Sequence, residues 1–220
     1  MSPILQIMLW LKTNIVKHQV ITLGEKDMKF WPQKKWKQIL LVVILTFIVI
    51  VASVLGFILF KINSDYTSEI KVTNPEGTQT ALIVYHPGFS SFMKDSAEAL
   101  ADGLVESDWR VEITTASSQA PTDLSGYSLL VLGSPVYGGN PSETIKRHLE
   151  RIEDLEGIPT VLLVTSAGSD GGAEATMQQT VEDHNGMILQ VISLYDTAPN
   201  EGDIDPLDLA EQAGRDLVIE

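Results

Sequence analysis

The apolar residues of the chain form one long uninterrupted run near its start. From Ile39 to Phe60 the sequence reads ILLVVILTFIVIVASVLGFILF, 22 residues without a charge. A helix of this length is about 33 Å long, slightly more than the hydrocarbon core of a bilayer. The alternatives are a buried core helix, which is rarely uncharged over about 18 residues, and a signal peptide, whose apolar region is shorter, about 7–15 residues. The run therefore predicts one transmembrane helix that anchors the chain in membrane lipid.

After residue 79 short apolar runs alternate with helical periodicities. Four apolar runs predict strands, 80–85, 127–132, 160–164 and 187–194, and the alternating segment 110–115 predicts a more exposed strand. Four segments with apolar residues three or four apart predict helices: 93–104, 145–152, 175–184 and 206–217. Strands that are apolar throughout are typical of parallel strands covered on both faces. This alternation predicts an α/β fold with a doubly wound five-stranded parallel sheet and helices on both faces.

These patterns divide the chain into four parts. Residues 1–38 form a basic N-terminal segment, 39–60 the transmembrane helix, 61–78 a polar linker with Asn-Pro and Gly, and 79–220 the α/β domain. Met28 opens MKFWPQKKWKQ, which has the character of a short basic segment before an anchor. We therefore hypothesise that translation starts at Met28 rather than at Met1.

The charges differ sharply between the two sides of the apolar run. Residues 1–61 carry eight Lys and two acidic residues, whereas residues 62–220 carry 7 basic and 27 acidic residues. Because an acidic domain repels phosphate backbones, we expect no nucleic-acid partner. Five lysines precede the run closely and two follow it, which favours a cytoplasmic N-terminus and an extracytoplasmic domain.

The residue types also limit the chemistry. The chain has no cysteine, which excludes disulfides, thiolate catalysis and cysteine-ligated metals. His148 and His184 have no partner at ligand spacing, so we expect no metal site. Ser90 and Ser91 lack a G-x-S-x-G elbow, and no side chain in the loops is an obvious catalytic base. We therefore predict no catalytic residue.

Three loops rich in Gly, Ser or Pro follow the predicted strands at their carboxyl ends: 86–91, 134–141 and 166–172. Ligands of open α/β sheets bind at this edge. The first loop opens a helix, so its glycine and hydroxyls suit an anion, although a Ser N-cap behind a Pro-Gly turn is the alternative. The second places Tyr137 beside two glycines, which favours close approach to a flat ring over a plain strand–helix turn.

From about Thr80 to Leu217 the chain resembles flavodoxin-like proteins, whose members bind FMN. The most specific match is GSPVYGGN, residues 133–140, and the order of the three loops agrees. The resemblance implies the strand order 2-1-3-4-5. It also implies that 86–91 holds the flavin phosphate, that Tyr137 stacks on the isoalloxazine and that 166–171 faces the pyrimidine edge.

The first loop departs from the family pattern. Members usually show Ser/Thr-x-Thr-Gly-x-Thr there, whereas this chain has HPGFSSF, with a proline that removes a donor and a bulky Phe89. The third loop lacks the aromatic that many flavodoxins place over the second face of the flavin.

The resemblance leads to a set of candidate FMN-binding residues: Gly88, Ser90, Ser91, Ser134, Pro135, Val136, Tyr137, Gly138, Gly139, Asn140, Ser166, Ala167, Gly168 and Ser169. We expect a membrane-anchored protein that binds FMN and transfers electrons, with a redox partner protein. The alternative is a flavodoxin-like module that has lost the cofactor and acts through partner or small-ligand binding. The intact second loop favours the first and the unusual first loop the second.

Overall fold

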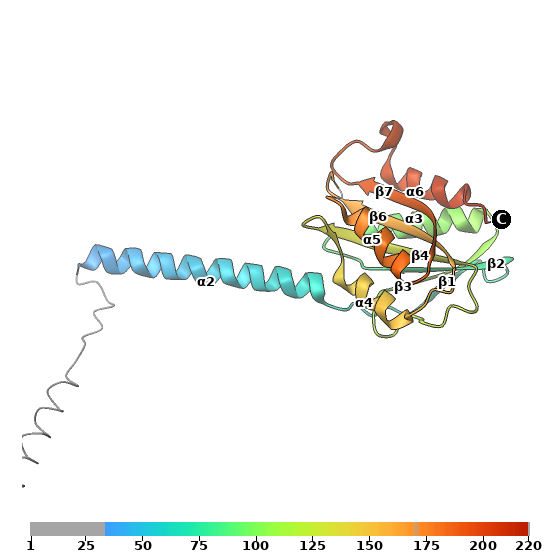
Figure 1. Ribbon diagram of the computed structural model, residues 1–220. Coiled ribbons are helices and arrows are strands. Elements are labelled where there is room, and N and C mark those ends of the chain that lie inside the picture. Colours follow the sequence, from blue (N-terminus) through green and yellow to red (C-terminus); the bar gives the residue numbers. More distant parts are fainter. Residues whose placement is uncertain (1–33, 170, 220) are drawn as a thin grey trace, which may run out of the picture. The chain divides into compact units, whose positions relative to one another are not determined.

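The computed structural model describes residues 34–169 and 171–219 (Figure 1). Helix α2, Lys35–Asn63, contains the whole predicted span. The most apolar 18-residue window of its stretch Lys35–Lys61 has a mean hydropathy of 3.2 and is not buried in the protein. One helix is thus long and apolar enough to cross a membrane. The basic segment before residue 34, including the hypothesis about Met28, lies outside the described residues.

The domain after residue 56 is built on a mostly parallel sheet (Figure 1). Its parallel strands are β2 (Gln79–Tyr85), β3 (Trp109–Thr115), β4 (Leu129–Tyr137), β6 (Pro159–Ser166) and β7 (Met187–Tyr195). They lie in the order β3-β2-β4-β6-β7, so the predicted order 2-1-3-4-5 and the α/β fold class are confirmed.

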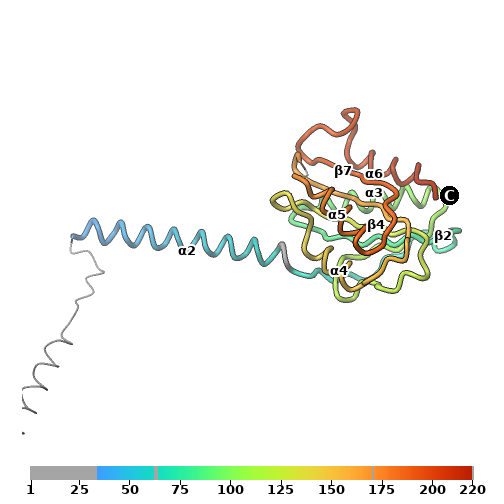
Figure 2. The backbone as a smooth tube through the Cα atoms, in the orientation of Figure 1, coloured from blue at the N-terminus to red at the C-terminus, as the bar shows by residue number. Residues whose placement is uncertain are grey.

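Four α-helices cover the two faces, and Figure 2 traces the alternation of strand and helix along the backbone. They are α3 (Phe92–Glu106), α4 (Glu143–Ile152), α5 (Ala173–Asp183) and α6 (Pro206–Arg215), and a short 3₁₀ turn, Glu201–Asp203, precedes α6. Helices α3 and α6 pack on one face, in a core with Ala81 and Ile83. Helices α4 and α5 pack on the other, in a core with Leu82 and Val84. Because successive residues of β2 enter opposite cores, the apolar run is explained by burial on both faces.

Two short strands were not predicted. Strand β1, Lys71–Thr73, pairs antiparallel with β3 and lies inside the segment 61–78 that the sequence indicates as a linker. Strand β5, Asn140–Pro141, turns back on the end of β4. Both are too short and too polar to give a period, so only their tertiary partners make them strands. Because β1 covers the outer edge of β3, that strand is mostly buried, and the more exposed strand expected from its alternating sequence is not found.

The fold places the ends of the five parallel strands at two opposite edges. The loop edge, as we call it, consists of the carboxyl ends of these strands and the loops that follow them. Its loops 86–91, 138–139 and 166–172 come from β2, β4 and β6, which are neighbours in the sheet. The opposite edge consists of the amino ends of the same strands.

Candidate functional site

A cleft of about 170 Å³ lies at the loop edge, where all three predicted loops meet. Residues 87–90, 92–93, 135–137 and 165–167 line it, together with Asp196 after β7. These segments are far apart in the sequence and meet because β2, β4 and β6 are adjacent. The cleft therefore lies where an open α/β sheet binds its ligands, beside the strand at which the order reverses.

The first loop rests on the ring of Tyr137. Gly88 has φ +74°, and a Cβ there would stand 3.1 Å from the Tyr137 hydroxyl, so glycine lets the loop approach the ring. The Phe89 ring meets the Tyr137 ring edge-on, with centroids 5.6 Å apart and planes at 84°. Phe89 is 52% exposed and Tyr137 is half-buried. One side of the tyrosine is thus occupied by a side chain that is itself open to solvent.

The helix after this loop begins without a side-chain cap. Ser91 is the N-cap of α3, and its hydroxyl makes no capping bond within the described residues. The Ser90 hydroxyl accepts a long 3.4 Å bond from the Phe92 N–H. Two exposed hydroxyls and the first turn of α3 could therefore receive an anion, although Asp95 in that turn would oppose it.

The two glycines after Tyr137 are the centre of a tight hairpin. Tyr137 pairs with Asn140, and both Gly138 and Gly139 have positive φ, 59° and 80°. A two-residue hairpin of this kind requires positive φ at both central positions. The plain turn thus accounts for the glycines by itself, and the hairpin also lies against the third loop. A Cβ on Gly139 would come within 2.9 Å of the Gly171 carbonyl oxygen.

The third loop is held by the segment after β7. The Asp196 N–H donates to the Ser166 carbonyl over 3.0 Å, and the Thr197 N–H donates to the Ala167 carbonyl over 2.9 Å. Gly168 stands against Ala198. These contacts fix the backbone of the loop and bring the Asp196 side chain to the cleft.

Two hydroxyl groups that line the cleft are buried without a hydrogen bond of normal geometry to any described residue: those of Tyr137 and Ser166. Burial raises the pKa of Tyr137 to about 12, and the neighbouring Tyr66 acts in the same direction, while the Phe89 backbone N–H opposes it. Buried polar groups are nearly always paired in native proteins. Both groups are consequently available to a ligand.

A buried histidine supports the cleft from behind. His86 is 1% exposed, and its Nδ1 shares a 2.6 Å hydrogen bond with Ser142 Oγ. The Ser142 N–H donates in turn to Ser134 Oγ over 2.8 Å. Burial lowers the pKa of His86 to about 4, Arg147 acts in the same direction and Asp65 opposes it. The neutral ring joins the first loop to β4 and to the start of α4.

Seven of the predicted residues line the cleft, and seven do not. Those in the lining are Gly88, Ser90, Pro135, Val136, Tyr137, Ser166 and Ala167. Outside it, Ser91 stands at the N-cap position of α3, Ser134 accepts from the Ser142 N–H, Gly138 and Gly139 form the turn, Asn140 donates to the Gly138 carbonyl, Gly168 meets Ala198, and Ser169 accepts from the Gly171 N–H.

The prediction missed other residues of the lining: Pro87, Phe89, Phe92, Met93, Thr165 and Asp196. Asp196 could have been found, because it follows the last predicted strand and therefore lies at the same edge. Phe92 and Met93 gave no such signal, since their apolar character is explained equally well by helix packing.

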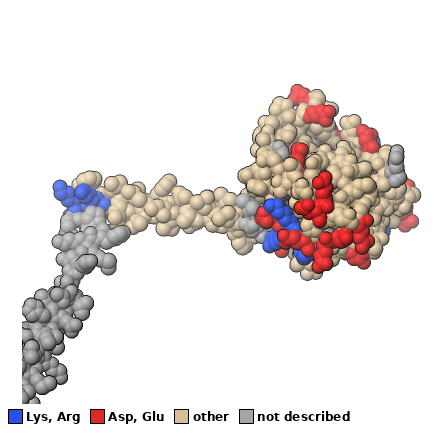
Figure 3. Space-filling model, in the orientation of Figure 1, with Lys and Arg blue, Asp and Glu red and all other residues tan. Residues whose placement is uncertain are grey.

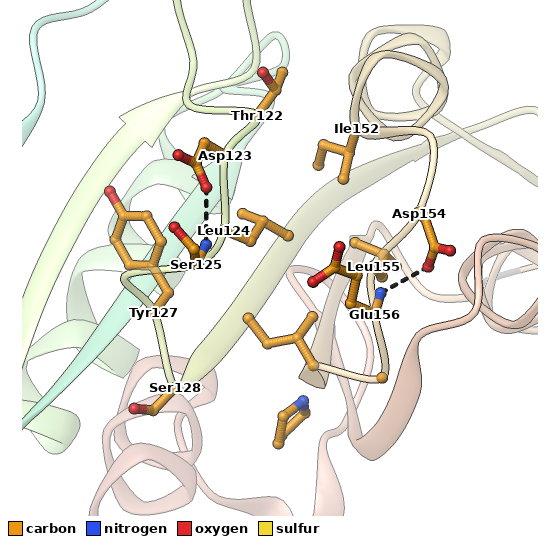
Figure 4. A pocket seen from close by; sticks show the side chains of 13 residues that line it. Thr122, Asp123, Leu124, Ser125, Tyr127, Ser128, Ile152, Asp154, Leu155 and Glu156 are labelled. Carbon is orange, nitrogen blue, oxygen red and sulfur yellow. Dashed lines mark hydrogen bonds between the residues drawn. The ribbon is translucent and has the colours of Figure 1, made fainter.

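A larger hollow, of about 510 Å³, lies at the opposite edge (Figure 4). Loops 122–128 and 152–159 form its walls. Asp123 accepts the Ser125 N–H over 3.0 Å, and Asp154 accepts the Glu156 N–H over 2.7 Å, as the dashed lines show. None of the described residues that line this hollow has a buried polar side-chain atom without a partner. In residues 34–169 and 171–219 no group of three or more His, Asp or Glu could hold a metal ion.

Comparisons with known proteins agree with this topology. A scan against protein-family models and a search of curated proteins find no match. Among solved structures, the two-electron reduced flavodoxin of Megasphaera elsdenii has a TM-score of 0.51 at 14% identity, covering 61% of this chain and 98% of that one. Oxidised flavodoxin 1 of Bacillus cereus has a TM-score of 0.50 at 14% identity, covering 63% and 99%.

A flavodiiron protein is also similar. The Flv1 flavodiiron core of Synechocystis sp. PCC6803 has a TM-score of 0.51 at 15% identity over 64% of this chain. The chain spans only 35% of that protein's length. At these identities the likeness concerns the fold, and the domain has a flavodoxin-like fold.

Proposed function

We propose that the domain binds FMN in the loop-edge cleft and transfers electrons, while α2 anchors the chain in a membrane. The observation that carries the proposal is the convergence of three sequence-distant loops on a cleft with two buried hydroxyls, those of Tyr137 and Ser166, that make no hydrogen bond of normal geometry to a described residue. The flavodoxin-like fold supports the same ligand class.

The hydrogen-bond donors at the loop edge suit FMN. Ser90, Ser91 and the first N–H groups of α3 would hold the phosphate, and Tyr137 with the hairpin backbone would contact the ring system. The Ser166 hydroxyl would face the polar edge of the ring. A flavin supplies the redox chemistry when bound, and the protein supplies binding, orientation and electrostatics.

The volume of the cleft is small for FMN. Cofactor pockets measure about 300–1,000 Å³, so 170 Å³ is too small for the whole ring system. Because Phe89 lies against Tyr137 and is more than half exposed, binding requires this ring to turn outward. The same packing supports the second candidate function, a module without cofactor whose Phe89 has taken the place of the flavin.

One spectrum separates the two functions. The full chain, purified in detergent, should show the visible absorption of a flavin or take up added FMN with quenching of flavin fluorescence. A colourless protein that does not bind added FMN would leave only the second function. Phe89→Ala should strengthen FMN binding, because it removes the ring that fills the cleft; an unchanged affinity would contradict this role of Phe89.

We further propose that the domain lies outside the cytoplasm, as the excess of lysines before the span favours. Protease added to intact spheroplasts should digest the domain. Protection until the membrane is lysed would reverse the orientation.

A further inference from the structure

The segment that follows α2 is fastened to the loop edge. Residues 64–70, which we call the strap, contact the carboxyl ends of β2 and β3 and the first half of α4. Asp65 pairs with Arg147 over 2.9 Å, and the Tyr66 ring lies 6.1 Å from the ring of His86. The Ser68 N–H donates to Thr115 Oγ1 over 3.0 Å, and Thr115 Oγ1 donates to the Tyr66 carbonyl. The anchor therefore joins the domain at the edge that carries the cleft.

The covalent connection limits how far this edge can lie from a bilayer. Lys61 ends the apolar stretch of α2, and its ammonium group stands 5.0 Å from the centre of the Tyr66 ring. The five peptide steps from Lys61 to Tyr66 span at most about 18 Å when fully extended. A domain of this size is about 35 Å across. The strap is thus tied within this distance of the end of the apolar stretch, and the opposite edge lies about a domain's width from the strap.

Helix α4, which begins at the loop edge, differs in charge from the other helices of the domain. Among the four α-helices in the described part of the domain, α4 alone has a net positive charge, with Lys146, Arg147 and Arg151 against Glu143 and Glu150. Figure 3 shows basic residues gathered over α4 on a face that otherwise carries mainly acidic ones. An anionic bilayer repels an acidic body and attracts the basic residues of α4.

Phe89 exposes an apolar surface at the same edge. Its ring, 52% exposed, belongs to the first loop. Exposed apolar side chains, Phe among them, insert into the boundary between lipid headgroups and acyl chains.

From these contacts we infer that the loop edge docks on the surface of an anionic bilayer, with α4 and Phe89 against the lipid. The cleft then opens toward the membrane, and whatever exchanges electrons with it arrives along the membrane plane. The inference rests on the membrane anchor of the proposed function and is independent of the flavin.

Because the chain has no cysteine, single labelled cysteines can test the docking. Ser90→Cys and Ser125→Cys are matched, since both serines are exposed and they lie at the loop edge and at the opposite edge. Each full-length variant is labelled with a fluorophore and placed in nanodiscs of anionic lipid that carry a quencher on the headgroup. We expect quenching to be several-fold stronger at position 90 than at position 125.

Two further measurements identify the cause. Zwitterionic nanodiscs, and Lys146→Glu in the Ser90→Cys background, should each reduce the quenching at position 90, because they weaken the attraction of α4. Equal quenching at the two positions in an inserted chain would overturn the docking and leave the anchor intact. A chain that does not insert into nanodiscs would overturn the anchor and the docking together, whereas FMN binding is measured separately.

Discussion

The two edges of the sheet carry hollows of opposite character. The one at the opposite edge is three times larger, 510 Å³ against 170 Å³, but its Asp123 and Asp154 carboxylates are engaged in the turns that form its walls. The cleft at the loop edge is smaller and has two buried hydroxyls without partners among the described residues. Satisfied polar groups stabilise turns, whereas unsatisfied ones cost free energy and indicate a ligand. Polar groups without a partner of normal geometry, and not volume, distinguish the cleft from the larger hollow.

The edges should also respond differently to acid, and this is the largest effect we predict. Burial lowers the pKa of His86 and of His148 to about 4, and Arg151 acts in the same direction on His148. Below pH 6.5 the unfolded chain binds protons that the folded chain does not, so stability falls as the pH drops from 6.5 to about 4. Each histidine should cost about 3 kcal/mol over this interval.

Replacement of one histidine tests the origin of this loss. His86→Asn keeps a polar group near Ser142 but cannot titrate, so between pH 6.5 and 5 the slope of unfolding free energy against pH should fall by about half. Urea denaturation at several pH values measures it. Asp123 and Asp154, at the opposite edge, have pKa values lowered by hydrogen bonds from Ser125 and Glu156, so their contribution is lost only below pH 4. An unchanged slope in His86→Asn would assign the acid loss elsewhere.

The next effect concerns the phosphate. If Ser91 binds it, Ser91→Ala should weaken FMN binding by about 1.5–3 kcal/mol, or one order of magnitude or more. Because the Ser91 hydroxyl makes no capping bond in the described structure, the change should leave stability nearly unaltered. Riboflavin, which has no phosphate, serves as the control ligand and should lose almost nothing. Equal losses for FMN and riboflavin would show that the first loop is an ordinary helix start.

The sequence predicted the sheet and the position of the loop edge better than the contacts of single residues at that edge. Strands that are buried on both faces have continuous apolar sequences, which predicted the sheet. The resemblance to flavodoxin-like proteins predicted the strand order, and the strand ends predicted the edge at which the three loops lie. The turn formed by Gly138 and Gly139 could not be told from a ligand contact, because positive φ and close approach both select glycine. The contacts of Asp65 and Tyr66 with residues some 20 to 80 positions away have no local signal, so the strap had the pattern of a linker.

A smaller effect compares two tyrosines, one at each edge. Tyr137 lines the cleft, whereas Tyr127 lines the opposite hollow and donates to Glu112 over 2.8 Å. Loss of stacking should make Tyr137→Ala weaken FMN binding by about 1–3 kcal/mol. Tyr127→Ala should affect stability but not affinity. A fluorescence titration that gives equal affinities for the two variants would refute the role of Tyr137.

The smallest effect compares two glycines that differ only in their edge. Gly138 and Gly157 have positive φ, 59° and 76°, and no described atom lies within 4 Å of the position a Cβ would take at either. Alanine should therefore cost each turn a similar 1–2 kcal/mol, about the penalty of a left-handed backbone. The hairpin of Gly138 adjoins the cleft, whereas Gly157 lines the opposite hollow. Since the added methyl would face a bound flavin only at position 138, Gly138→Ala should weaken FMN binding a few-fold while Gly157→Ala leaves it unchanged. Thermal unfolding supplies the stability control: if the two variants lose equal stability and equal affinity, affinity follows stability alone, and the hairpin makes no contact with the ligand.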